Sequence, residues 1–129
     1  MARDGVAVSP ELAALIARHA VGDRVDVAAE CADLGVPHEV KGEAVICFVV
    51  LRPETAPGET LRAELSDLVA RHMGKALKPE RVLFVADLPK TRSAKIMRRV
   101  IRATYLGKDP GDLSSLDNPG AVKAIAESR

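Results

Sequence analysis

Aromatic side chains are nearly absent from this sequence, in which they form 2% of the residues as one Tyr, two Phe and no Trp. A hydrophobic core must therefore be built from Val, Leu, Ile and Ala, and the supply is sufficient because 47% of the residues are hydrophobic. The length of 129 residues fits one domain, so we expect a single domain over residues 1–129.

A strong excess of one charge is also missing. The 19 Lys and Arg residues face 18 Asp and Glu residues, and the net charge of +1 excludes nucleic-acid binding through overall charge, so any anion site has to be local. Cysteine is scarce as well: Cys31 and Cys47 lie in separate apolar segments, and no Cys or His spacing resembles a zinc site. We interpret both as buried reduced thiols, which suit a reducing cytosol, and expect no bound metal.

Long apolar runs are absent too. No stretch is long enough to span a membrane, and the N-terminus lacks the basic-then-apolar pattern of a signal peptide. The sequence therefore predicts a cytoplasmic protein without a membrane partner.

What the sequence does contain is a regular succession of helix and strand patterns. Ser9-Pro10-Glu11 is typical of a helix start, and apolar residues at helical spacing continue to about His19. Strands are predicted over residues 25–36, 44–51 and 81–86, with a polar turn over 37–43. The middle strand is an unbroken apolar run, which is typical of a strand covered on both faces.

Three more helices follow from the same patterns. Thr60 is expected to cap a helix that ends at Gly74, a second helix is expected from about Ser93 to Leu106, and a short helix over 119–127 follows a loop over 107–118. The order of elements predicts an α+β fold, a small sheet of about three strands flanked by helices.

The segment Leu88 to Arg102 (L-P-K-T-R-S-A-K-I-M-R-R-V-I-R) carries the chemistry. We expect Lys90, Arg92 and Lys95 to crowd around the first turn of the helix that it opens. A helix N-terminus prefers acidic neighbours, so local stability would not select these cations. A site for a phosphate or carboxylate would, because helix N–H groups and cationic side chains then converge on one anion.

Other interpretations of this basic segment remain open. A solvent-exposed charged surface explains the same residues and is favoured when the charges are considered alone. A nucleic-acid patch would need interleaved aromatic side chains, and a membrane-surface helix would need Trp or Phe anchors; the segment has neither.

Three segments resemble acetyl-CoA synthetases and related adenylate-forming enzymes. P-K-T-R-S-A-K-I-M-R-R, Pro89 to Arg99, resembles their C-terminal lysine motif, and G-V-P-H-E-V-K-G-E, Gly35 to Glu43, resembles another recurring segment. The tail G-D-L-S-S-L-D-N-P-G-A-V, Gly111 to Val122, is similar to the ends of acetyl-CoA and propionyl-CoA synthetases. The resemblance covers about residues 27–125. It implies the C-terminal domain of an AMP-forming acyl-CoA synthetase, with the adenylate-forming enzyme C-terminal domain fold.

The resemblance also implies a mechanism. A large N-terminal domain, which this chain lacks, binds ATP with Mg²⁺ and a small carboxylic acid, and the small domain swings between two positions. Lys95, at the position of the motif lysine, helps to form the acyl-adenylate through its charge. In the second position the small domain lines a channel for CoA. The chain alone is then expected to hold no cofactor and to be inactive.

Two cations of the basic segment, Lys90 and Arg92, are candidates for binding substrate or nucleotide. Further residues carry over from the resemblance. Gly42 and Glu43 belong to a segment near the domain interface and the CoA channel, although turn formation also explains Gly42. Counting back from Lys95 places the arginine that contacts the CoA 3′-phosphate at Ala70, so the adjacent Arg71 is the candidate, with a solvent-facing helix charge as the alternative.

Two departures and one regulatory feature complete the resemblance. Ala94 stands where Gly is usual, and we expect little harm because Ala is tolerated in a first helical turn. Residues 1–26 match the family poorly, and its hinge segment is not recognisable there. In the family, reversible acetylation of the motif lysine removes its charge, so a lysine acetyltransferase and a deacetylase are implied partners of Lys95.

Two other classes of function compete with the enzyme interpretation. One is a non-catalytic module that binds an anion or a nucleic acid through Lys90, Arg92 and Lys95. The other is a regulatory domain that docks on a separate adenylating subunit.

Overall fold

The computed structural model describes residues 15–16, 28–40 and 42–128. The predicted helix from Ser9 to about His19 lies outside the described residues, except for Leu15 and Ile16, which are helical. The elements, in order, are β1 (Ala28–His38), β2 (Gly42–Leu51), α2 (Glu59–Met73), the 3-10 turn η1 (Lys75–Leu77), β3 (Arg81–Phe84), α3 (Arg98–Tyr105) and α4 (Gly120–Ser128).

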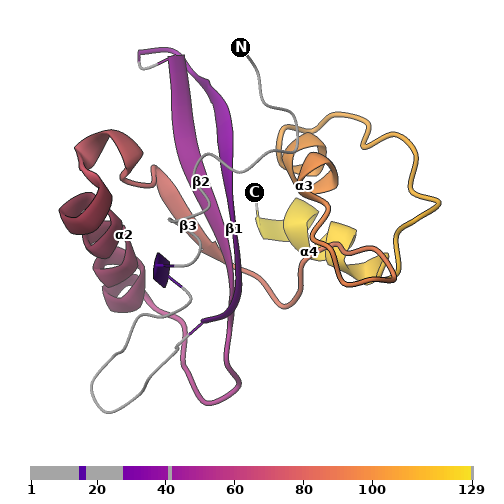
Figure 1. Ribbon diagram of the computed structural model, residues 1–129, viewed down its shortest axis with the longest axis horizontal. Coiled ribbons are helices and arrows are strands. Elements are labelled where there is room, and N and C mark those ends of the chain that lie inside the picture. The colour runs from indigo at the N-terminus through magenta and orange to yellow at the C-terminus, as the bar shows by residue number, and fades with distance from the viewer. Residues whose placement is uncertain (1–14, 17–27, 41, 129) are drawn as a thin grey trace.

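The three strands form one mixed sheet in the order β1-β2-β3 (Figure 1). β1 and β2 are an antiparallel hairpin with Val36 opposite Ala44, and the register shifts between Ala28 and Glu30. β3 runs parallel to β2, with Phe84 opposite Val49. The α+β fold with about three strands is confirmed.

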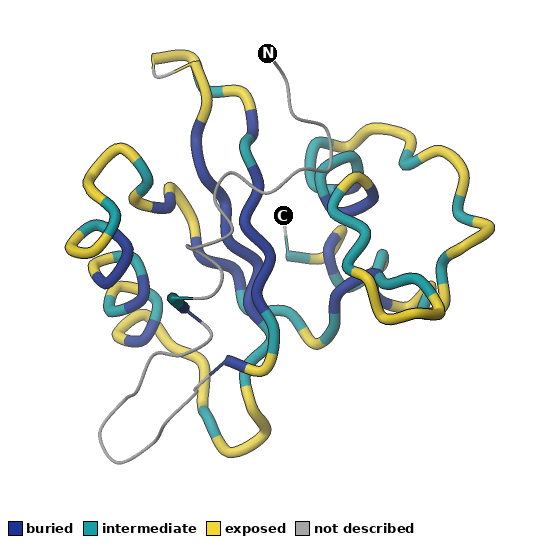
Figure 2. Tube along the Cα trace, in the orientation of Figure 1, coloured by how far each residue is buried: buried dark blue, intermediate teal, exposed yellow. Residues whose placement is uncertain are grey.

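Helices cover both faces of this sheet, with α2 on one face and α3 and α4 on the other (Figure 1). Successive side chains of a strand point to opposite faces, so β2 serves two cores. Val45, Cys47 and Val49 pack with buried residues of α2, whereas Ile46 and Phe48 pack with buried residues of α3 and α4. Figure 2 shows the buried strands at the centre, as the unbroken apolar run predicted.

Of the two ends predicted for α2, only the C-terminal end agrees with the structure. The helix ends at Gly74, whose φ of 92° suits glycine and whose N–H donates to the Ala70 carbonyl over 3.1 Å. Its N-cap is Gly58, and Thr60 lies inside the first turn, so the predicted Thr60 cap is wrong. Glycine is an accepted N-cap, and Glu59 in the first turn complements the helix dipole.

The last two helices also differ in how well they were predicted. α4 agrees with the expected helix over 119–127, and residues 107–118 form no helix or strand. By contrast, α3 begins at Arg98 rather than near Ser93, so the predicted first turn of this helix is not helical. Residues 93–97 belong to the preceding loop, which carries the candidate site.

Both cysteines are buried free thiols, as predicted. Cys31 and Cys47 belong to the core between the sheet and α2. Among the described helices, none combines the length and the apolar character needed to cross a bilayer.

Candidate functional site

The candidate site is a loop over residues 87–97, here called the lysine loop, which links β3 to α3. Its two sides pair with each other: Lys90 and Ile96 form an antiparallel bridge, and the Met97 N–H donates to the Pro89 carbonyl over 2.8 Å. Leu88 and Pro89 are buried, and Ile96 packs against the core below α3. The loop is therefore anchored at its base.

A tight turn closes the lysine loop at its tip. The Thr91 N–H donates to the Lys95 carbonyl, and the Ala94 N–H donates to the Thr91 carbonyl, both over 2.9 Å. The Lys95 N–H also donates to Oγ1 of Thr91 over 3.2 Å. Ala94 has a φ of 68°, in the left-handed region that glycine adopts most readily. The turn thus uses the backbone groups that a helix would need.

This geometry overturns two expectations. Lys90, Arg92 and Lys95 do not surround a helix N-terminus, because α3 begins three residues after Lys95. Ala94 occupies a left-handed turn, not a first helical turn, so the reason expected for its tolerance was wrong as well. The anion argument based on the helix dipole therefore does not apply to this loop.

Lys95 lies near the tip of the loop and is exposed. Its ammonium has no hydrogen-bond or ion-pair partner within the described ranges, and the same is true of the exposed Arg92 side chain. The backbone that carries Lys95 is held by several hydrogen bonds while its charge is left available. Such a group can approach an anion supplied by another domain or molecule.

Lys90 has a different environment from Lys95. Its Nζ contacts the Glu30 carboxylate and lies 3.6 Å from Oδ1 of Asp87, and its side chain is 22% exposed. The hydrogen bond with Glu30 is the main reason that the pKa of Lys90 is raised, although partial burial opposes the shift. Lys90 therefore ties the lysine loop to β1, and an incoming phosphate would compete with two carboxylates for it.

Two arginines of α3, Arg99 and Arg102, also stabilise the fold. Nη2 of Arg99 donates to the Asp112 carbonyl over 3.0 Å, and its Nη1 donates to the Pro110 carbonyl. Nε of Arg102 donates to the Gly35 carbonyl over 3.0 Å. These contacts fasten the loop after α3 and the end of β1.

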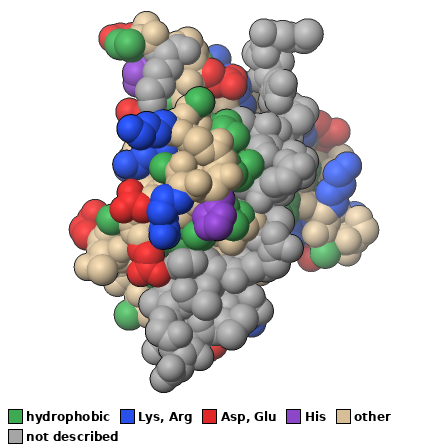
Figure 3. Space-filling model, turned by 60° about the vertical axis from the view of Figure 1, so that its left-hand side comes forward, with side chains coloured by type: hydrophobic (Ala, Val, Ile, Leu, Met, Phe, Trp, Pro, Cys, Tyr) green, Lys and Arg blue, Asp and Glu red, His purple; other side chains and the backbone are tan. Residues whose placement is uncertain are grey.

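Arg71 and Lys95 lie on opposite sides of the sheet. Arg71 is exposed in the last turn of α2, where its Nε donates to the Asp67 carbonyl over 3.4 Å. It lines an open hollow together with Lys75 and Lys78, and with two carboxylates. Figure 3, turned so that the α2 side comes forward, shows Lys and Arg side chains next to Asp and Glu side chains there.

Gly42 and Glu43 begin β2 at the hairpin. Gly42 has a φ of 81°, which explains why this position suits glycine. The Glu43 carboxyl lies over Gly35, where an added Cβ would come within 2.5 Å of Cδ of Glu43. This end of β2 is opposite to the end at Val49, beside which β3 leads into the lysine loop.

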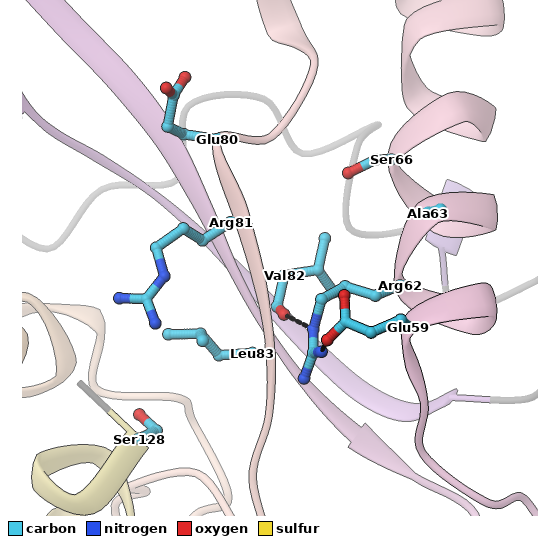
Figure 4. A pocket seen from close by; sticks show the side chains of 9 residues that line it. All are labelled: Glu59, Arg62, Ala63, Ser66, Glu80, Arg81, Val82, Leu83 and Ser128. Carbon is cyan, nitrogen blue, oxygen red and sulfur yellow. Dashed lines mark hydrogen bonds and ion pairs between the residues drawn. The ribbon is translucent and has the colours of Figure 1, made fainter.

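Another hollow lies between α2, β3 and the end of α4 (Figure 4). Both of its cations, Arg62 and Arg81, have partners. Arg62 contacts Glu59, and its Nε donates to the Val82 carbonyl over 2.6 Å. The Arg81 guanidinium donates to the Tyr105 hydroxyl over 3.0 Å. None of the residues predicted for the site lines this hollow.

Sequence reasoning missed Asn118, which contacts the lysine loop, and Asp87, which belongs to the loop. Asn118, in the tail before α4, bonds to Asp87, Leu88 and Lys90. Burial raises the pKa of the Asp87 carboxyl, but hydrogen bonds from Asn118 and the Leu88 N–H and the charge of Lys90 outweigh it and lower the pKa. The only signal in the sequence was that this tail resembles a recurring C-terminal segment.

Comparison with known proteins places this chain in a family. Residues 20–95, more than half of the chain, match the family described as AMP-binding enzyme C-terminal domain. The acetyl-coenzyme A synthetase of Methanothrix thermoacetophila is 47% identical over 97 residues, which cover 75% of this chain and 15% of that protein. Acetyl-coenzyme A synthetase 2 of Pseudomonas aeruginosa is 42% identical over 106 residues, which cover 81% of this chain and 16% of that protein.

Solved structures agree with the sequence relatives. The acyl-CoA synthetase of Brucella canis superposes with a TM-score of 0.67 at 30% identity, covering 75% of this chain and 17% of that one. The acetoacetyl-CoA synthetase of Streptomyces lividans has a TM-score of 0.74 at 16% identity and covers 91% of this chain and 17% of that one, which shows the shared fold. The chain therefore spans about one sixth of the length of these proteins.

Proposed function

The chain belongs to the family of AMP-binding enzyme C-terminal domains, and we propose that it acts as the mobile C-terminal domain of an AMP-forming acyl-CoA synthetase. Lys95 would supply positive charge during acyl-adenylate formation. The sites for ATP and the carboxylic acid would lie on a large domain, and Mg²⁺ would accompany ATP there.

The ammonium of Lys95, which is exposed and has no partner among the described residues, is the observation that carries this proposal. The neighbouring cation Lys90 is engaged with two carboxylates, whereas Lys95 is presented at the end of a hydrogen-bonded turn. A fixed positive charge stabilises a transition state best where negative charge develops and water is excluded. Closure of this domain over a large domain would bring Lys95 to the carboxylate and the α-phosphate.

The positions of the other candidate residues support two orientations of this domain relative to the large domain. Arg71 lies on the opposite side of the sheet from the lysine loop, and Gly42 and Glu43 lie at the opposite end of β2. No single orientation would present all of them equally to one active site. In our proposal Lys95 faces the active site during adenylation, and the surface with Arg71, Gly42 and Glu43 contributes to the CoA channel during thioester formation.

The same proposal covers substrate, regulation and location. The large domain would choose the acid, and the acetyl-CoA synthetase relatives favour a small one such as acetate. A lysine acetyltransferase could reach the exposed Lys95, and acetylation would remove its charge until a deacetylase restored it. The enzyme would work in the cytoplasm, and nucleic acid has no role in it.

The test uses a hybrid enzyme that joins this full chain to the large domain of the Methanothrix thermoacetophila acetyl-CoA synthetase. We expect the hybrid to make acetyl-CoA from acetate, ATP and CoA. Lys95→Ala should lower its rate by about 100- to 1,000-fold, the usual effect of removing one transition-state contact to developing charge. The matched control is Lys123→Ala, which removes an exposed lysine of α4 and should leave the rate unchanged. An inactive hybrid, or equal rates for the two variants, would contradict the proposal.

A further inference from the structure

The tail that precedes α4, residues 111–119, runs alongside the lysine loop, and Figure 1 shows the two segments side by side before α3 and α4. Leu116 forms an antiparallel bridge with Thr91, and the Asp117 N–H donates to the Lys90 carbonyl over 2.8 Å. The tail therefore adds a third stretch of backbone to the two paired sides of the loop.

One side chain makes most of the remaining contacts between these segments. Nδ2 of Asn118 donates to Oδ2 of Asp87 and to the Leu88 carbonyl, each over 2.8 Å. Oδ1 of Asn118 accepts the Lys90 N–H, also over 2.8 Å. A primary amide has two donors and one acceptor, and here all three functions are directed at the base of the lysine loop.

The contacts reach Lys95 through two further steps. Asn118 and Asp117 hold the N–H and the carbonyl of Lys90, and Thr91 beside it is bridged to Leu116. Thr91 in turn bonds to the N–H and the carbonyl of Lys95. The position of the Lys95 backbone thus depends on where the tail holds residues 90 and 91.

We propose that Asn118 is a positioning residue for adenylate formation, because it fixes the loop that presents Lys95. This inference rests on the proposed function of Lys95. A displacement of about 1 Å from the productive geometry can lower a rate about 100-fold. The three hydrogen bonds of Asn118 to the lysine loop, here called the latch, therefore affect the rate beyond their contribution to folding.

The chemistry of the latch requires an amide. Alanine at position 118 would remove all three bonds. Aspartate would keep the acceptor for the Lys90 N–H but would face the Asp87 carboxylate without a proton to donate. The charged groups near this position are Asp87 and Lys90 on the loop, Glu30 on β1 and Asp117 on the tail.

The kinetic test uses the hybrid enzyme and follows the two half-reactions separately. For Asn118→Ala we expect adenylate formation to slow by about 10- to 100-fold, while thioester formation from pre-made adenylate changes by less than about threefold. The control is Arg62→Ala, which removes contacts of α2 on the opposite side of the sheet. It tests whether loss of stability alone slows adenylation. Equal effects of the two variants on adenylation would overturn the proposal.

Asn118→Asp provides a readout that a purely structural role would not change. Two facing carboxylates favour sharing a proton, and the protonated form regains one donor between positions 118 and 87. The adenylation rate of this variant, divided by that of the unchanged hybrid, should therefore rise as the pH is lowered from about 8 to about 6. A ratio that stays constant over this range would overturn the proposal.

Amide hydrogen exchange on the full 129-residue chain separates the latch from the proposed function. Asn118→Ala should speed exchange of the Lys90 and Thr91 amides by at least about tenfold and leave the α2 amides unchanged. Unchanged exchange at both loop amides would overturn the latch even if Lys95 proves essential. Faster exchange combined with an active Lys95→Ala hybrid would instead contradict the proposed role of Lys95, and with it this inference.

Discussion

Ala94 has a φ of 68°, and no other non-glycine residue in the described ranges has a positive φ. The left-handed conformation costs an L-residue with a Cβ about 1–2 kcal/mol. Ala94 is exposed, so replacing it by Gly removes little buried surface. The substitution to consider is therefore Ala94→Gly. It relieves backbone strain in the folded chain, which raises the free energy of unfolding, but it also gives the unfolded chain more conformational freedom, which lowers that free energy.

The two effects have comparable sizes, and the relief is the larger. Glycine raises the entropy of the unfolded chain by the equivalent of about 0.5–1 kcal/mol. The net result expected for Ala94→Gly is a gain of about 0.5–1 kcal/mol in the free energy of unfolding. For a domain of this size, the melting temperature should rise by about 2–4 °C. Ala94→Val should do the opposite, because a β-branched residue tolerates positive φ poorly.

Thermal and urea unfolding of the full chain, followed by circular dichroism, measures these changes. The matched control is Ala63→Gly, the same substitution at an exposed position inside α2, which should lose about 1 kcal/mol. Opposite signs for the two substitutions support the left-handed turn. If Ala94→Gly destabilises the chain as much as Ala63→Gly does, the turn geometry is wrong.

Three other properties can be checked on the same chain. The hydrogen bond with Cys31 and burial raise the pKa of the Cys47 thiol well above its usual value, so a thiol reagent at neutral pH should modify Cys47 only as the chain unfolds; rapid reaction of the folded chain would refute this. Because the pKa of Asp87 is lowered by folding, its contribution to stability is present above its unfolded pKa of about 3.9 and is lost as the pH falls through the folded value. Asp87→Asn should therefore reduce the loss of unfolding free energy at acidic pH. The difference should be less than about 1 kcal/mol, because the Asp87 side chain is 46% exposed. Urea midpoints that depend on pH in the same way with and without the substitution would contradict this. Arg62 donates to the Val82 carbonyl and lies 4.9 Å from the centre of the Phe84 ring, so Arg62→Ala should lose about 1–2 kcal/mol in urea unfolding; complete recovery in Arg62→Lys would argue against the stacked geometry.

The strands and most helices could be predicted because their patterns are local. The apolar run from Ala44 to Leu51 indicated a strand buried on both faces, and the structure places a separate core on each face. Gly74 indicated the end of α2 through a backbone preference that belongs to the residue itself. Such signals need no knowledge of distant parts of the chain.

The beginning of α3 could not be predicted in the same way. Ser93 to Met97 contains residues that tolerate a helix, and the local pattern continues smoothly into Arg98. The chain forms a turn here instead of a helix because Ile96 packs against the core and because Leu116 and Asn118 of the tail bond to the loop. Leu116 and Asn118 lie more than 20 residues from the loop residues that they contact, and the periodicity of a segment carries no information on such distant partners.

In the candidate site, too, some features could be predicted from local sequence and others could not. Lys95 is a prediction from the resemblance of its segment, whereas the helix-dipole argument that accompanied it is wrong. The pairing of Lys90 with Glu30 joins residues that are distant in sequence, and so does that of Asn118 with Asp87. Sequence patterns therefore indicate which charged residues matter, but the fold is needed to distinguish Lys90, which is paired with carboxylates, from Lys95, which has no partner among the described residues.

The most direct test of the central claim is to measure both half-reactions of the hybrid enzyme with and without Lys95→Ala. Adenylate formation is followed by acetate-dependent exchange of pyrophosphate into ATP, and thioester formation by adding CoA to pre-made acetyl-adenylate. We predict that the first reaction falls by about 100-fold or more while the second stays within about threefold of the unchanged hybrid. Equal loss of both reactions, or loss of neither, would contradict the role assigned to Lys95.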